Sequence, residues 1–259
     1  MTWTIRPRSE IARLSAIRKG TGPLIVMIHG VGLRSEAWNA QIDLLAERYS
    51  VIAIDMPGHG ESQVPSGDMA ISDYTDAIAA TLTEPALIVG HSMGAVIATD
   101  LAERYSDSVR GLAALNAIFE RTEDATAAVK ARANSLDGKT VGDPSQTLIR
   151  WFGAEESSER AACELWLTSV SPLGYKIAYS AFAHSDGPKR AALEKLHCPA
   201  LFMTGENEPN STPEMSLQMA KLAPHGRAEI ISGAAHMMPM THATEVNRSL
   251  LAFADEVWT

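Results

Sequence analysis

Long apolar runs and cysteine are both scarce in this 259-residue sequence. No segment reaches the roughly 18 consecutive apolar residues that a membrane-spanning helix requires. Only two cysteines occur, Cys163 and Cys198, and their spacing is typical of neither a disulfide framework nor a zinc site. We therefore expect a soluble protein with reduced cysteines and without a metal site.

Positive charge is also in short supply. The chain has 22 Lys and Arg residues against 31 Asp and Glu residues, a net charge of −9 at pH 7. It contains neither a basic stripe nor an aromatic RNA-reading motif, which argues against a nucleic-acid partner and favours a small neutral or apolar ligand. The first twenty residues lack the continuous apolar segment of a secretory signal, which predicts a cytoplasmic location.

Short, mostly continuous apolar runs indicate strands that are buried on both faces. They cover residues 24–29, 51–55, 86–90, 111–116, 199–204 and 228–232. Segments between them place apolar residues on one helical face, which predicts an α/β fold with a mostly parallel sheet and helices on both sides. Before the first run, the alternating residues 11–18 and the turn signal KGTGP predict two paired strands in the first thirty residues.

The alternation of strands and helices stops between residues 118 and 197. Four helical patterns follow one another there, two of them opened by Asp143-Pro144 and Ser171-Pro172. We predict a helical lid over residues 118–197, inserted into a core domain of residues 1–117 and 198–259. Seven of the fifteen aromatic residues lie in this segment, and we expect most to pack the lid onto the core and a few to line an apolar pocket.

The sequence IVGHSMGA, residues 88–95, places Ser92 between Gly90 and Gly94 where a predicted strand gives way to a helix. Gly-x-Ser-x-Gly in this context is typical of a nucleophile elbow. A sharp turn exposes the serine hydroxyl, and the glycines leave room for the neighbouring strand and helix. Ser92 is therefore the candidate nucleophile.

A serine hydroxyl attacks well near neutral pH only if a base removes its proton, so this hypothesis requires a histidine. His236 is the candidate, because it follows the last predicted strand and precedes the final helix. A carboxylate is then needed to orient the histidine and stabilise its charged form. Glu208 stands just past the strand predicted at 199–204, and Glu206 is the nearby alternative.

Acyl transfer also needs hydrogen-bond donors for the negative charge that develops on the carbonyl oxygen. The sequence HGVG, residues 29–32, follows a predicted strand, and its glycines allow tight backbone geometry. The amides of Val31 and of Met93, which follows Ser92, are the candidate oxyanion donors. His29 is expected to be structural. No cofactor or metal is implied, because activation of serine by histidine needs neither.

Taken in order, these motifs resemble those of the α/β-hydrolase family. The matching segments are HGVG (29–32), DMPGHGES (55–62), GHSMGA (90–95), TGENEP (204–209) and GAAHMM (233–238). The resemblance covers nearly the whole chain. It implies an eight-stranded, mostly parallel sheet with an antiparallel second strand, a helical lid after the sixth strand, and a catalytic triad in the order Ser92, Glu208, His236.

The acid departs from the pattern of the family, since Glu208 stands where aspartate is usual. Some relatives carry an alternative acid at the end of the sixth strand, but this chain has Asn116 there. Glu120 would then be the remaining alternative, if the chain turns back toward the histidine.

A serine at the elbow implies attack at an acyl carbon, and the surrounding motifs resemble the enol-lactonase and small carboxylesterase branch. We therefore expect an enzyme that hydrolyses a small, largely apolar carboxylic ester or lactone. The alternative is a carbon–carbon bond hydrolase of a dienone or β-diketone acid, for which Arg150 and Lys176 are candidate anchors of the substrate acid. A ligand receptor with slow turnover is a third hypothesis.

Overall fold

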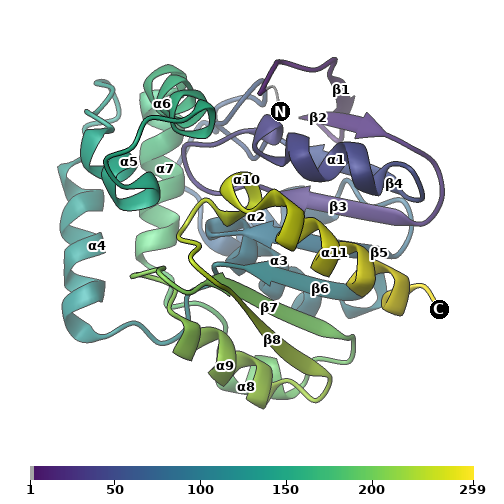
Figure 1. Cartoon of the computed structure of the whole chain (residues 1–259). Coiled ribbons are helices and arrows are strands. Elements are labelled where there is room, and N and C mark those ends of the chain that lie inside the picture. Colours follow the sequence, from purple (N-terminus) through teal and green to yellow (C-terminus); the bar gives the residue numbers. More distant parts are fainter. Residues whose placement is uncertain (1–2) are drawn as a thin grey trace.

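The computed structural model describes residues 3–259, which fold around an eight-stranded sheet (Figure 1). The strands are β1 (Ser9–Ile11), β2 (Leu14–Lys19), β3 (Leu24–Ile28), β4 (Ser50–Ile54), β5 (Ala86–His91), β6 (Val109–Leu115), β7 (Ala200–Gly205) and β8 (Gly226–Ile231). Their order across the sheet is β1-β2-β4-β3-β5-β6-β7-β8. Only β2 runs antiparallel to its neighbours, so the predicted mostly parallel sheet with an antiparallel second strand is confirmed.

The central strands are buried on both faces because alternate side chains enter two separate cores. In β3, Val26 and Ile28 belong to one core, and Ile25 and Met27 belong to the other. The first core is closed by α2 (Ile71–Ala79), α3 (Met93–Arg104) and α9 (Pro213–Leu222), and the second by α1 (Asn39–Leu45) and α11 (Ala243–Val257). Short helices η1 (Ser35–Trp38), η2 (Ser106–Ser108) and α10 (Met238–Thr241) complete this part of the chain.

The hairpin that opens the sheet turns at a different place from the one that the sequence suggests. β1 and β2 are joined by Ala12 and Arg13, with φ of 47° and 71°. Two consecutive positive φ values are typical of the tight turns that join antiparallel strands, where Asn and Gly are the usual residues. The paired strands predicted for the first thirty residues are therefore present, but their turn lies inside the alternating stretch and carries no sequence signal.

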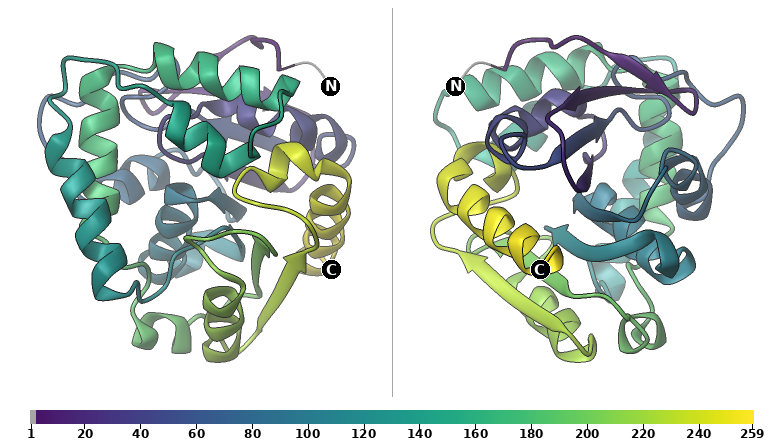
Figure 2. Two further views of the ribbon diagram at one scale, coloured as in Figure 1. Left: turned by 60° about the vertical axis from the view of Figure 1, so that its left-hand side comes forward. Right: turned by 90° about the vertical axis from the view of Figure 1, so that its right-hand side faces the viewer.

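Between β6 and β7 lies a purely helical segment, which we call the insertion. It contains α4 (Glu123–Ser135), α5 (Ser145–Phe152), α6 (Ser158–Ser169), α7 (Pro172–Ala183) and α8 (Arg190–Glu194). The four predicted helical patterns correspond to α4 to α7, which gather at one end of the sheet (Figure 2). The fifth helix, α8, spans only five residues, too few for a helical period to be recognised. The division into a core of residues 1–117 and 198–259 and a lid of residues 118–197 stays a prediction.

A third apolar cluster joins the insertion to the rest of the protein. Leu148 of α5 and Trp166 and Leu167 of α6 pack there against Leu33 and Met237, which lie outside the insertion. Trp151, Phe152 and Tyr175 pack against the same cluster. Several aromatic residues of the insertion thus help to attach it to the rest of the protein, as the sequence predicts.

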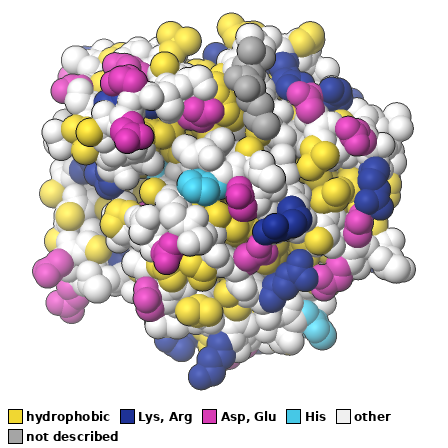
Figure 3. Space-filling view, viewed as in Figure 1, with side chains coloured by type: hydrophobic (Ala, Val, Ile, Leu, Met, Phe, Trp, Pro, Cys, Tyr) yellow, Lys and Arg dark blue, Asp and Glu magenta, His cyan; other side chains and the backbone are white. Residues whose placement is uncertain are grey.

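None of the helices within residues 3–259 is both long and apolar enough to cross a membrane. On the face shown in Figure 3, acidic and basic side chains are interspersed, and that face has no extended area of positive charge. The predicted cytoplasmic location stays a prediction.

Candidate active site

Ser92 lies in the turn between β5 and α3, at the carboxyl edge of the sheet. Its backbone has φ 57° and ψ −119°, in a region that non-glycine residues seldom adopt. Such strain persists only where the surrounding structure fixes the backbone, and it is concentrated at functional sites. The local geometry is therefore that of the predicted elbow.

The two flanking glycines are required by close backbone contacts. A Cβ atom on Gly90 would lie 2.1 Å from the carbonyl oxygen of Gly94. A Cβ atom on Gly94 would lie 2.2 Å from the carbonyl oxygen of Ile28 in β3. Because real Cβ atoms do not approach oxygen so closely, only glycine lets the strand, the turn and the helix pack at these distances.

The structure brings Glu208 and His236 together. Glu208 Oε2 lies 2.6 Å from His236 Nδ1, and both side chains are largely buried. Burial alone would raise the pKa of Glu208, but the charge and hydrogen bond of His236, together with the amides of Asn210 and Ser211, lower it to about 2. Glu208 is therefore ionised at neutral pH and able to stabilise a protonated imidazole.

The two alternative acids lie elsewhere. Glu206 is exposed, and its carboxylate accepts hydrogen bonds from the Ser232 hydroxyl and the Gly233 amide. Glu120 forms an exposed ion pair with Arg190. Neither acid contacts His236 in the part of the chain that the structure describes.

Asn116 contributes to the site in a way that the sequence did not suggest. It follows β6 with φ 51°, and its Nδ2 donates to Glu208 Oε2 at 3.2 Å. The same nitrogen lies 3.2 Å from the hydroxyl oxygen of Thr204. The position where an alternative acid was considered thus holds a hydrogen-bond donor to the acid that contacts the histidine.

Two other rings lie close to the imidazole of His236. The indole of Trp151 stacks on it, with centroids 5.2 Å apart and an interplanar angle of 22°. His91 lies 4.9 Å away, and its Nε2 donates to the carbonyl oxygen of His236 at 2.8 Å. Burial lowers the pKa of His91 to about 3, so this ring is neutral and acts as a fixed support.

The loop expected to bind the oxyanion lies directly against the nucleophile. A Cβ atom on Gly30 would lie 3.5 Å from Ser92 Oγ. Neither the amide of Val31 nor that of Met93 donates a hydrogen bond to another residue within 3–259. Two backbone donors therefore remain available near Ser92, which is what an oxyanion hole requires.

Two buried histidines hold that loop in place. His29 Nε2 accepts from the amide of Met56, so its Nδ1 donates to the carbonyl oxygen of Gly30 at 2.7 Å. His59 Nε2 accepts from the amide of Gly32 at 3.0 Å. Burial lowers the pKa of both rings, that of His59 to about 3, so both are neutral. The structural role expected for His29 agrees with these contacts.

Asp55 explains why the segment DMPGHGES lies next to this loop. Its buried carboxylate accepts hydrogen bonds from the amide and hydroxyl of Ser35 and from the amide of Glu61. It thereby connects the start of η1 to the turn that carries His59. Within the described residues, no group of three or more His, Cys, Asp or Glu side chains is arranged to hold a metal ion.

The Ser92 hydroxyl forms no hydrogen bond with any side chain in residues 3–259, and it is therefore not hydrogen-bonded to His236. In enzymes without bound substrate, such hydrogen bonds are often long and tighten only when the substrate binds. The described site thus has an acid–histidine hydrogen bond but no hydrogen bond between the histidine and the serine.

The sheet, the elbow and the order of these residues agree with a known family, and the model of the alpha/beta hydrolase family matches residues 25–249. This chain belongs to the alpha/beta hydrolase family. As the family name and the hydrolases among its relatives indicate, it is an enzyme that catalyses hydrolysis.

Three comparisons place this α/β-hydrolase among its relatives. It is 40% identical over 245 residues to the (E)-2-((N-methylformamido)methylene)succinate hydrolase of Acinetobacter baylyi, with 92% of each chain covered. It is 30% identical to a pimeloyl-[acyl-carrier protein] methyl ester esterase of Chromobacterium violaceum, over 89% of this chain and 94% of the relative. A thermophilic esterase from Thermogutta terrifontis, in a malate-bound structure, has the same fold, with a TM-score of 0.88, 24% identity and coverage of 98% of this chain and 100% of that chain.

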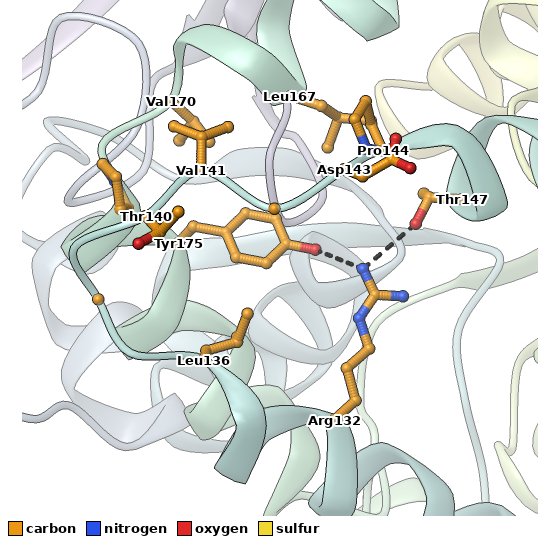
Figure 4. Close-up of a pocket in the computed structure, with 13 residues that line it drawn as sticks. Arg132, Leu136, Thr140, Val141, Asp143, Pro144, Thr147, Leu167, Val170 and Tyr175 are labelled. Carbon is orange, nitrogen blue, oxygen red and sulfur yellow. Dashed lines mark hydrogen bonds between the residues drawn. The ribbon is translucent and has the colours of Figure 1, made fainter.

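This α/β-hydrolase also has a small pocket inside the insertion, with a mostly apolar lining and one arginine, which the sequence did not predict (Figure 4). The Tyr175 hydroxyl and Arg132 Nη2 lie 3.0 Å apart, and the same nitrogen lies 3.2 Å from Thr147 Oγ1. Of the two anchors considered from sequence, Arg150 is exposed and lies 3.4 Å from Thr147 Oγ1, and Lys176 lines a different groove beside α2 and α3.

Proposed function

We propose that this α/β-hydrolase cleaves a small carboxylic ester or lactone through an acyl-enzyme on Ser92. The observation that carries the proposal is the 2.6 Å contact between Glu208 Oε2 and His236 Nδ1 at the same sheet edge as the strained Ser92. A carboxylate that is ionised and buried against a histidine gives the base orientation and charge stabilisation that serine attack requires.

In the proposed first half-reaction, Ser92 Oγ attacks the substrate carbonyl carbon while His236 Nε2 takes the hydroxyl proton. Glu208 accepts the Nδ1 hydrogen bond and stabilises the imidazolium. The amides of Val31 and Met93 donate to the oxyanion. When the tetrahedral intermediate collapses, the bond to the leaving group breaks and His236 gives its proton to that group.

In the second half-reaction, water attacks the acyl carbon and His236 takes a proton from it. Collapse of the second tetrahedral intermediate breaks the bond to Ser92 Oγ, which regains the proton from His236. The product acid then leaves. The cycle regenerates the free enzyme and consumes one water.

The names of the relatives support an acyl substrate and suggest its charge. One relative hydrolyses a methylenesuccinate that carries an N-methylformamido group, a compound with two carboxylates and an amide. The other acts on a methyl ester. Both compounds present an acyl carbon to the same kind of nucleophile. We propose that the substrate of this chain likewise presents an acyl carbon and carries a carboxylate.

Carbon–carbon bond hydrolysis of a dienone or β-diketone acid is the second candidate. It would use the same three side chains, and it needs a cationic anchor for the acid. Arg132, which has no carboxylate partner within 4 Å in residues 3–259, favours keeping this candidate. Turnover of a ring-fission dienone acid measured beside an aryl ester separates the two reactions. Faster turnover of the dienone would replace ester hydrolysis as the proposed activity.

Labelling with a fluorophosphonate tests the nucleophile and the base together. We expect a single adduct by intact mass, mapped to the peptide that contains Ser92, and none in Ser92→Ala. His236→Ala should label at least about a hundredfold more slowly, because the hydroxyl loses its base. An adduct at another residue, or an unchanged labelling rate in His236→Ala, would contradict the proposal.

A further inference from the structure

Arg132 is a half-buried cation for which the described chain supplies no countercharge. It lies on α4, and neither a carboxylate within 4 Å nor any acceptor for its Nε and Nη1 is present in residues 3–259. Its Nη2 meets two neutral hydroxyl groups, those of Thr147 and Tyr175. Its guanidinium also lies 4.9 Å from the ring centroid of Tyr179. The charge is therefore held in place by neutral groups, with part of its hydrogen-bonding capacity unused.

Asp143 is the single acidic residue that lines the pocket, and it already accepts hydrogen bonds from another residue. Its carboxylate accepts hydrogen bonds from the amide and hydroxyl of Ser145 at the start of α5. Those two hydrogen bonds lower the pKa of Asp143, and the bond from the hydroxyl has the larger effect. It therefore holds the turn just before α5 and does not pair with Arg132.

One side chain connects the pocket to residues 29–32, the loop that we propose to bind the oxyanion. Tyr175 reaches Arg132 with its hydroxyl, while its ring lies against Gly32, where an added Cβ atom would be 2.9 Å from the ring carbon Cε2. Leu167, which also lines the pocket, lies against Gly32 as well. The side chain of Tyr175 therefore connects Arg132 to Gly32, the residue after Val31.

The size of the pocket suits part of a substrate and not a whole one. Its volume is about 60 Å³, against roughly 300–1,000 Å³ for a complete ligand pocket. Figure 4 shows the Tyr175 ring and the Arg132 guanidinium facing the space enclosed by Val141, Pro144 and Val170. A cation with two hydroxyl groups in a space of this size matches a carboxylate, which accepts several hydrogen bonds in one plane.

We propose that Arg132, Tyr175 and Thr147 form a carboxylate subsite that holds the anionic end of the substrate while its acyl carbon lies at Ser92. This inference rests on the proposed function and narrows its substrates to acyl compounds that carry a second, ionised carboxyl group. The guanidinium can donate new hydrogen bonds from Nε and Nη1. The Tyr175 hydroxyl can rotate so that its proton points toward the anion.

Two esters that differ by one charge test the subsite. Monomethyl succinate and dimethyl succinate share the acyl chain and the leaving group, and only the first is an anion at pH 7. We expect a higher kcat/KM for the monoester in the wild-type enzyme. In Arg132→Gln, kcat/KM for the monoester should fall roughly 10- to 100-fold, the size expected for hydrogen bonds to a charged group. For the diester it should change less than about threefold.

Lys130→Gln is the matched control, because it removes one positive charge from an exposed position of α4, the helix that carries Arg132, and Lys130 does not line the pocket. It should leave the preference for the monoester unchanged. Tyr175→Phe keeps the ring against Gly32 and removes only the hydroxyl, so we expect an intermediate loss with the monoester. Equal losses for both esters in Arg132→Gln, or a lost preference in Lys130→Gln, would overturn the proposed subsite.

Protection against fluorophosphonate gives a readout that does not depend on turnover. Succinate should slow the labelling of Ser92 in the wild-type enzyme, and its half-protecting concentration should rise at least about tenfold in Arg132→Gln. If Ser92 is labelled in both proteins and succinate protects them equally, the subsite is wrong while the serine hydrolase proposal stands. If Ser92 is not labelled in either protein, the proposed function itself fails.

Discussion

The indole of Trp151 and the imidazole of His236 are stacked, with centroids 5.2 Å apart and planes inclined by 22°. Trp151 belongs to α5 of the insertion, and His236 follows β8 of the sheet. The helix therefore covers one face of the ring that we propose as the base. The orientation of that ring depends on the insertion as well as on Glu208.

Trp151→Ala should lower kcat for an ester roughly 3- to 30-fold, because the imidazolium loses a cation–π contact and the ring gains rotational freedom. Trp151→Phe should retain most of the activity, since it keeps an aromatic face. Steady-state kinetics of both variants check this. Trp166→Phe, a substitution in the third apolar cluster away from His236, is the control for general loosening of the insertion. A wild-type kcat in Trp151→Ala would contradict the expectation.

Glu208→Gln should reduce kcat by roughly 10³- to 10⁴-fold, as expected when a triad acid can no longer hold the correct tautomer of its histidine. Glu206→Gln is the matched control in the same loop and should retain activity within about twofold, because its side chain is exposed and bonded to Ser232 and Gly233. A larger loss in Glu206→Gln than in Glu208→Gln would reverse the assignment of the acid.

The lowered pKa of Glu208 also predicts a loss of stability in acid. Its pKa is about 2 in the folded protein and 4.5 ordinarily, so the folded state releases this proton more readily than the unfolded state. The stabilisation is fully present above pH 4.5, and it is lost as the pH falls from 4.5 toward 2. It amounts to roughly 3 kcal/mol for the buried group.

Urea unfolding between pH 6 and pH 3 measures this effect. As the pH is lowered from 6 to 3, the free energy of unfolding should decrease less in Glu208→Gln than in the wild-type protein. Ser92→Ala, which leaves the Glu208–His236 pair intact, should keep the wild-type slope. Identical slopes in Glu208→Gln and the wild-type protein would show that another group controls acid stability.

Gly94→Ala should destabilise the fold by at least about 2 kcal/mol, because its methyl group would meet the backbone of β3 2.2 Å away. Gly67→Ala is the matched control, since no atom lies within 4 Å of the added methyl group. Thermal unfolding of the two variants gives the comparison. Similar melting temperatures in the two variants would mean that the backbone around Ser92 accommodates the methyl group with little loss of stability.

Much of the fold could be predicted from the sequence, because strands that are buried on both faces are recognisable as continuous apolar runs. Residues 24–28 are continuously apolar, since alternate side chains enter different cores. The elbow was equally visible, because close backbone contacts at Gly90 and Gly94 allow no other residue. Where sterics permit one residue type, the sequence reveals the local structure.

Features that depend on distant partners left no such trace. The hydrogen bond from Asn116 joins it to Glu208, 92 positions away along the chain. Arg132 looks like any charged residue of a polar helix until folding brings Tyr175, 43 positions away, to its side. The turn at Ala12 and Arg13 is tolerated by the strands around it and not favoured by its own residues.

Helix α7 is fixed in two places, and this limits how substrate enters. Its Ala178 and Ala181 belong to the core cluster of the sheet and α3, while Tyr175 rests on Gly32. Swinging α7 outward would open that core and release the loop of residues 29–32. The segment from Gly138 to Gly153 begins and ends at glycines with positive φ, but it is attached as well, because Leu148 of α5 packs against Leu33 and Met237. Movement of α5 would have to separate this cluster and the stacked rings of Trp151 and His236.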